Sequence, residues 1–140
     1  MQNTQGTSPA RGYHSWQYGC TFILNFFMLI VATELHIRDF WKFFPFVRHA
    51  ARSMKQAKGS PGIIHAADSN RGWRIGFTLT AWENREAMLR FRNSGAHKEA
   101  MKQISRLSHR YKTLAWEAET VPGWEEAKRR LAETPFKILT

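Results

Sequence analysis

The sequence is poor in cysteine, in acidic residues and in long apolar runs. Its single cysteine, Cys20, excludes an internal disulfide framework and a zinc site built from cysteines. Only 11 Asp and Glu oppose 21 Lys and Arg, so the formal charge is +10, which raises nucleic acid or an anionic membrane surface as a partner. The basic residues are spread over two predicted helices and the tail, without a phosphate loop, zinc finger or RNA-binding aromatic motif. We therefore interpret the charge as a solvated basic face and do not expect nucleic-acid binding.

The longest apolar run, 22–32, is too short to cross a membrane. As a helix it would extend about 16 Å, half of the hydrocarbon core. It could instead be the apolar region of a signal peptide, but only Arg11 precedes it, and cleavage after it would remove the first predicted strand. We expect a cytoplasmic protein without a membrane span. Residues 1–27 are interpreted as a disordered leader or an extension, with Met28 as a candidate natural start, and residues 28–140 as one domain.

Aromatic residues are abundant instead, at 14% of the chain with six Trp and ten Phe. Side chains of this size have to be buried in a core, a subunit interface or a ligand pocket. A chain of 140 residues is long enough for one domain with its own core.

The periodicity predicts a β-α-β-β-α-β order. Alternating or continuous apolar runs predict strands, and apolar residues at steps of three and four predict helices, with Asn84 and Ser94 as N-caps. The predicted strands are 29–35, 63–67, 73–82 and 112–120, and the predicted helices are 44–58, 85–92, 95–107 and 124–133. In the first helix the expected buried stripe is Phe40, Phe44, Val47, Ala51 and Met54. The order indicates an α+β fold, ferredoxin-like, with an antiparallel four-stranded sheet, both main helices on one face and an additional C-terminal helix.

Such a fold leaves the second face of the sheet uncovered, and here that face is expected to be apolar. The first two strands are apolar on both sides, and the second face of the third strand is expected to carry Trp82. If roughly 600 Å² of apolar surface stayed in water, the lost stabilisation would be on the order of 15 kcal/mol. We therefore predict a homodimer in which two sheets pack face to face as a dimeric α/β barrel.

Four stretches of the chain are similar to a known superfamily. They are Ser60-Pro61-Gly62, FTLTAWE at 77–83, FRNSGAHKEAM at 91–101 and VPGWE at 121–125. The segment 28–133 resembles the dimeric α/β-barrel superfamily that includes the antibiotic-biosynthesis monooxygenases, and within it a bacterial branch similar to spheroidene monooxygenase. The resemblance implies a cavity between helices and sheet for a flat apolar substrate, and oxidation either without a cofactor or with haem. The positions that match the Trp and His of haem-degrading members are Phe91 and Met101, which argues against haem degradation.

His97 is the candidate catalytic residue. It is expected on the apolar face near the start of its helix, where the helix dipole favours a neutral ring that could act as a general base or bind haem iron. The alternative is a buried structural histidine that is hydrogen-bonded to a carbonyl. The remaining candidate substrate-binding residues are Arg74, Trp82, Phe91, Asn93 and Met101. For Trp82 and Arg74 burial in the dimer interface is the favoured alternative, and helix capping already explains Ser94.

No metal site or hydrolytic triad is expected. His36, His49 and His65 lie on different predicted elements and lack a ligand spacing. We therefore predict a monooxygenase-like protein that oxidises a flat aromatic or polyene substrate, with haem or no cofactor. The alternative is a non-catalytic dimeric module that binds a hydrophobic ligand or haem.

Overall fold

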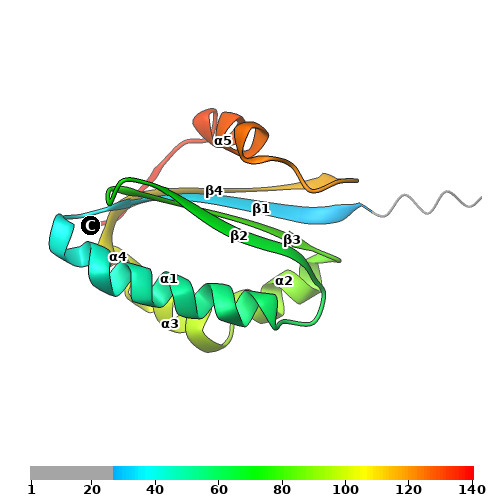
Figure 1. Ribbon diagram of the computed structural model, residues 1–140, viewed down its shortest axis with the longest axis horizontal. Helices are drawn as coiled ribbons and strands as arrows, with labels where there is room; N and C mark the ends of the chain where they lie inside the picture. The colour runs from blue at the N-terminus through cyan, green and yellow to red at the C-terminus, as the bar shows by residue number, and fades with distance from the viewer. Residues whose placement is uncertain (1–26) are drawn as a thin grey trace, which may run out of the picture.

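The structure is a computed structural model that describes residues 27–140. A single antiparallel sheet with the strand order β2-β3-β1-β4-β5 runs through the molecule (Figure 1). Its strands are β1 (Met28–Ile37), β2 (Ile63–Arg71), β3 (Ile75–Trp82), β4 (Ser108–Ala118) and the short β5 (Lys137–Ile138). The first four are the predicted strands in the ferredoxin-like order, and β5 is an edge strand that the sequence did not indicate. The predicted leader, except for Phe27, lies outside the described residues.

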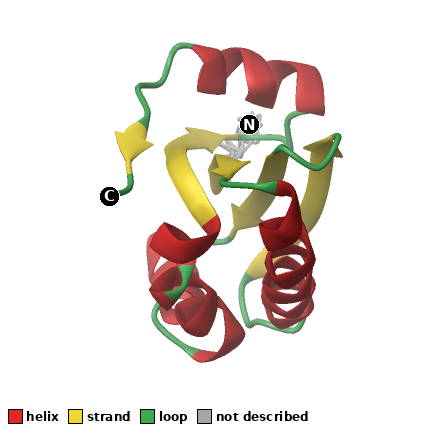
Figure 2. Cartoon of the chain, turned by 90° about the vertical axis from the view of Figure 1, so that its left-hand side faces the viewer, coloured by secondary structure: helices red, strands yellow, loops and turns green. Residues whose placement is uncertain are grey.

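Helices cover both faces of this sheet. A 3-10 turn, η1 (Phe40–Lys42), leads into α1 (Phe43–Lys58), which lies on one face with three further helices, and α5 lies on the opposite face (Figures 1 and 2). The other helices are α2 (Arg85–Arg92), α3 (Gly95–Lys102), α4 (Ile104–Leu107) and α5 (Trp124–Ala132). The architecture is therefore the predicted α+β, ferredoxin-like fold with a C-terminal helix. No helix within residues 27–140 is long and apolar enough to cross a membrane.

The two faces of β3 are assigned opposite to the prediction. Phe77, Leu79 and Ala81 are buried in a core together with residues of α5. The even-numbered residues of β3 face the main helices. A side-chain carbon added at Gly76, for example, would lie 2.7 Å from Cζ of Phe46 on α1. Trp82, on this same face, is fully buried within the chain. The prediction that Trp82 lies in a dimer interface is therefore wrong.

Helix α5 covers much of the sheet face that was expected to need a second subunit. Its Ala127 and Leu131 are fully buried against Ile30, Phe77 and Leu79. The prediction of a dimer required this face to be open to water, because the sequence does not show that α5 lies on it. The apolar area that supported the argument is thus largely removed from water within one chain.

Helix α1 is rotated relative to the predicted stripe. Phe40, Phe44 and Val47, expected to be buried, are 46%, 55% and 43% exposed. The start of α1 is apolar on several sides, so periodicity alone did not identify the face that contacts the sheet. A 3-10 turn precedes the helix, and Asp39 caps η1 by accepting a hydrogen bond from the backbone N of Lys42.

The predicted caps behave differently from each other. The side chain of Asn84 accepts a 2.8 Å hydrogen bond from the backbone N of Ala87 and caps α2 as predicted. Ser94 makes no such bond at the start of α3, and its hydroxyl donates to the carbonyl of Arg90 instead. Ser94 is therefore the N-cap residue of α3 as predicted, but its side chain does not cap the helix.

Candidate functional site

Three aromatic rings form a continuous stack in the layer between the sheet and the helices. Trp82 comes from the end of β3, Phe91 from α2 and His97 from α3. Ring centroids lie 5.0 Å apart between Trp82 and Phe91, and 4.6 Å apart between Phe91 and His97. These distances are in the range of favourable aromatic pairs. Three of the predicted site residues are thus brought together, and we call them the aromatic stack.

The polar end of the Trp82 indole is satisfied inside the chain. Its Nε1–H donates a 2.9 Å hydrogen bond to Oγ1 of Thr80, and both residues are buried. The two side chains are on the same face of β3, since they are two residues apart on a strand. This bond holds the ring plane of Trp82 against Phe91.

The imidazole of His97 is held with a defined tautomer. Its Nδ1 lies 3.3 Å from the backbone carbonyl of Arg92, and because a carbonyl only accepts, Nδ1 carries the proton. Nε2 therefore keeps a lone pair. Burial lowers the pKa of His97 below its usual value of 6.5, the carbonyl of Arg92 opposes this, and the Arg92 charge adds to it. The imidazole is consequently neutral near pH 7, and burial, not the predicted helix dipole, is the main cause of the lowered pKa.

Gln56 on α1 positions His97 and was missed in the sequence. Its Oε1 accepts a 2.8 Å bond from the backbone N of His97, and its Nε2 donates to the carbonyls of Phe91 and Ser94. Gly95, with φ of +60°, leaves room for this amide, because an added side-chain carbon would lie 3.0 Å from it. A single Gln late in a helix carries no sequence pattern that points to this role.

A buried hydroxyl without a partner lies in the same layer. Ser53 is on the sheet-facing side of α1, one helical turn before Ala57, which packs in the cluster that contains Trp82. Its Oγ is buried and has no hydrogen-bond partner. A buried polar atom of this kind is costly unless a water or ligand satisfies it. Ser53 therefore marks a polar position inside an otherwise apolar layer.

The remaining predicted site residues are not part of the stack. Asn93 is exposed at the end of α2, where its backbone N–H donates to the carbonyl of Leu89. Met101 is 37% exposed on α3. Arg74 precedes β3 at the opposite end of that strand from Trp82, with its guanidinium over the ring of Trp73. Arg74 and Trp82, both candidate substrate-binding residues, therefore do not lie in one site, because they stand at opposite ends of β3.

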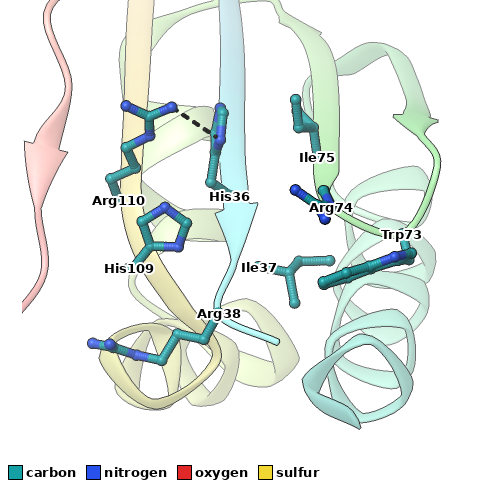
Figure 3. A pocket seen from close by; sticks show the side chains of 8 residues that line it. All are labelled: His36, Ile37, Arg38, Trp73, Arg74, Ile75, His109 and Arg110. Atoms are coloured by element: carbon teal, nitrogen blue, oxygen red, sulfur yellow. Dashed lines mark hydrogen bonds between the residues drawn. The ribbon is translucent and has the colours of Figure 1, made fainter. Parts of the chain in front are cut away.

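The arginine lines a different cavity that the sequence did not indicate (Figure 3). It has a volume of about 430 Å³ and lies where β1 ends and β3 and β4 begin, with Arg38, Arg74 and Arg110 among its lining residues. The lining also includes His36, Ile37, Trp73, Ile75 and His109. Burial, together with the charges of Arg110, His36 and Arg38, lowers the pKa of His109. We call this cavity the arginine cavity.

Within residues 27–140 no group of three or more His, Cys, Asp or Glu is placed to hold a metal ion.

An open groove of about 570 Å³ lies between the end of α1 and the start of α3, and Gln56 and Ala96 line it beside His97. This groove is the surface depression next to the aromatic stack.

The sequence matches no family model and no curated protein, whereas the fold has clear counterparts. SnoaB, a cofactor-independent oxygenase from Streptomyces nogalater, superposes with a TM-score of 0.57 at 13% identity over 69% of this chain and 99% of its own. A candidate antibiotic biosynthesis monooxygenase from Nitrosomonas europaea gives 0.61 at 10% identity over 69% of this chain and 94% of its own. A protein of unknown function from Bacteroides thetaiotaomicron gives 0.58 at 13% identity over 66% and 99%. The chain therefore has the fold of antibiotic-biosynthesis-monooxygenase-like proteins, while the similarity to spheroidene monooxygenase stays a prediction.

Proposed function

We propose that the protein is a cytoplasmic monooxygenase-like enzyme that binds a flat aromatic substrate against the aromatic stack. The observation that carries the proposal is the geometry of His97: a neutral imidazole with its proton on Nδ1 is held against Phe91, which in turn packs on Trp82. The half-buried ring of Phe91 can stack on a planar ligand, and a fixed Nε2 lone pair of His97 can remove a proton from it. The fold shared with SnoaB supports the choice of oxidation as the reaction class.

The chemistry that such a base supports starts at an acidic C–H or O–H group. In an anthrone, for example, His97 Nε2 would take a proton from the ring methylene and leave an electron-rich enolate. Dioxygen then oxidises the enolate: one oxygen atom becomes the new carbonyl and the other leaves as water with the two former methylene hydrogens. The methylene carbon supplies all four electrons that reduce dioxygen to the carbonyl oxygen and water, so no external reductant is needed. A polyene lacks an acidic proton of this kind, and the aromatic class is therefore the better match to His97.

Haem does not fit the surroundings of His97. An axial ligand needs a cavity on the Nε2 side that is wide enough for the porphyrin plane. Neither the arginine cavity nor the groove beside α1 provides a cavity of that width at His97, whereas a smaller planar substrate needs only to reach the stack from the groove, which Gln56 and Ala96 line beside His97. We therefore derive no step through haem. The buried hydroxyl of Ser53 instead offers a hydrogen-bond partner to a substrate oxygen.

The experiment measures dioxygen consumption with anthrone as the test substrate. We expect the His97→Gln variant to lose about 100-fold or more of the catalysed rate, as is usual when a general base is removed. His49→Gln, on α1 outside the stack, is the matched control and should keep the rate. Wild-type protein that does not accelerate the reaction, yet shifts the Trp fluorescence on binding anthraquinone, would support the alternative of a non-catalytic binding module. Equal rates in the two variants would contradict the role of His97.

We also propose that the protein forms a homodimer. Phe27 before β1 and Ile64 on the edge strand β2 are 49% and 46% exposed, and an interface would remove them from water. Sedimentation velocity at micromolar concentration tests the assignment. A species of twice the chain mass of 16.3 kDa is expected, and a monomer alone would contradict it.

A further inference from the structure

The two most exposed aromatic side chains of the described structure, Trp41 and Phe44, lie together with Phe40 where η1 joins α1. Trp41 is 76%, Phe44 is 55% and Phe40 is 46% exposed. Phe40 touches both of the others edge to face, with ring centroids 5.7 Å apart in each case. We call these three residues the aromatic tip. Val47, one turn further along α1, extends it and is 43% exposed.

Leaving such a tip in water is unfavourable unless it has a partner. Contiguous exposed apolar surface on a soluble chain marks interaction with a protein or a membrane. Trp and Phe are the side chains that lie at the headgroup level of a bilayer, where the ring meets both polar and apolar groups. The chemistry of the tip therefore agrees with an interfacial location.

The charges around the tip are complementary to an anionic surface. Helix α1 contains no acidic residue, and its exposed face beyond the tip carries a row of cations: Arg48, Arg52, Lys55 and Lys58. Asp39 is the acidic residue next to the tip, and its carboxylate is used to cap η1. An apolar patch followed by cations on one helix is the pattern of helices that bind the surface of anionic membranes.

The arginine cavity adjoins the tip through Trp73. The ring of Trp73 lies 5.7 Å from Phe40 and also lines the cavity. None of the lining residues is acidic, and Nε of Arg110 is buried without a hydrogen-bond partner. The guanidinium of Arg74, over the ring of Trp73, lies beside the apolar tip. That of Arg110 lies on the other side of the cavity (Figure 3), over the ring of Phe136 and with one Nη 3.4 Å from Nδ1 of His36.

The nearby carboxylate does not neutralise these groups. Glu34 is shared between His36, at 2.7 Å, and Lys112, at 3.5 Å. Arg38 donates to the carbonyls of Ser105 and Leu139 and keeps its charge. Three arginines and one lysine against a single carboxylate leave this end of the molecule positive, and guanidinium groups bind phosphate well.

We propose that this end of the molecule is a docking surface for an anionic lipid bilayer. The aromatic tip enters the headgroup region, the exposed cations of α1 lie along the surface, and Arg74 and Arg110 in the arginine cavity bind a lipid phosphate. The inference does not depend on the oxygenase proposal, because it uses a different part of the molecule.

Vesicle flotation tests the surface with full-length protein. Wild-type protein should bind vesicles that contain phosphatidylglycerol and should not bind pure phosphatidylcholine vesicles. Trp41→Ser with Phe44→Ser should weaken binding at least about tenfold, because the apolar contact is lost. Arg74→Gln with Arg110→Gln should weaken it about 25-fold, from a loss of roughly fivefold for each cation near the surface. The matched control is Arg85→Gln with Arg129→Gln, exposed arginines of α2 and α5, which should change binding less than either test variant.

The outcomes separate docking from the alternatives. Vesicle binding that is unchanged in the aromatic variant overturns the proposal, as does a loss of binding that is equal in the cavity and control variants. A second experiment measures the binding of inorganic phosphate to the same variants at matched ionic strength. Arginine-dependent phosphate binding without vesicle binding would show a site for free anions instead, and a tip-dependent doubling of the molecular mass without lipid would show that a second copy covers the tip. Either result overturns the lipid assignment.

Discussion

Replacing Trp82 by alanine should strongly destabilise the folded chain. Trp82 is fully buried, packs on Phe91 and donates a hydrogen bond to Thr80. Truncating a buried Trp costs about 3–5 kcal/mol. With a urea dependence of about 2 kcal/mol per molar, the unfolding midpoint should fall by roughly 2 M.

The assay is equilibrium unfolding in urea at two protein concentrations about 20-fold apart, followed by far-UV circular dichroism. The matched control is Trp41→Ala, at a position that is 76% exposed, which should change stability by less than about 0.5 kcal/mol. Because Trp82 is buried within one chain, its loss should cost the same at both concentrations. A penalty for Trp82→Ala that depends on concentration, or one as small as that of Trp41→Ala, would refute this placement and restore the interface interpretation.

Three further predictions follow from single contacts. Gly76→Ala should destabilise the fold by about 1–3 kcal/mol in thermal unfolding, because the added carbon would lie 2.7 Å from the ring of Phe46; an unchanged melting temperature would contradict the close contact. Asn84→Ala should cost about 1 kcal/mol, since the cap of α2 is lost, whereas Asn84→Asp should restore most of it. Lowering the pH should remove the stability that the neutral His97 contributes. This contribution to stability is present in full above pH 6.5, the pKa of the unfolded chain, and it is lost as the pH falls from 6.5 to the lower pKa of the folded chain. The His97→Gln variant should lack this part of the pH dependence of stability.

The order of the elements could be predicted from the sequence, but their faces could not. The alternation in β3 identified the strand, yet its residues are buried or half-buried on both faces, so periodicity did not show that Trp82 faces α1 and Phe77 faces α5. The same ambiguity misplaced Phe44, because aromatic residues occupy nearly every position at the start of α1. Which apolar side is buried depends on long-range packing, and a single sequence does not contain that information locally.

Only the local part of the candidate site could be predicted from the sequence, because its other contacts join distant segments of the chain. The turn between α2 and α3 places Phe91 and His97 six residues apart, and this local geometry could be predicted. Gln56 reaches His97 from 41 residues earlier in the chain, a contact that only the tertiary structure brings about. The arginine cavity likewise forms where distant strand ends meet: His36 and Arg110 are paired across β1 and β4.

The most direct measurement of the central claim is the nitrogen NMR spectrum of the His97 imidazole, recorded as a function of pH with and without anthraquinone. We predict a proton on Nδ1, a pKa below 6.5, and shifts of both His97 Nε2 and the Trp82 indole when the planar ligand is added. A His97 ring with a pKa at or above 6.5 would contradict the proposed site. So would binding of anthraquinone that leaves the His97 signals unchanged, because the ligand would then lie elsewhere on the protein.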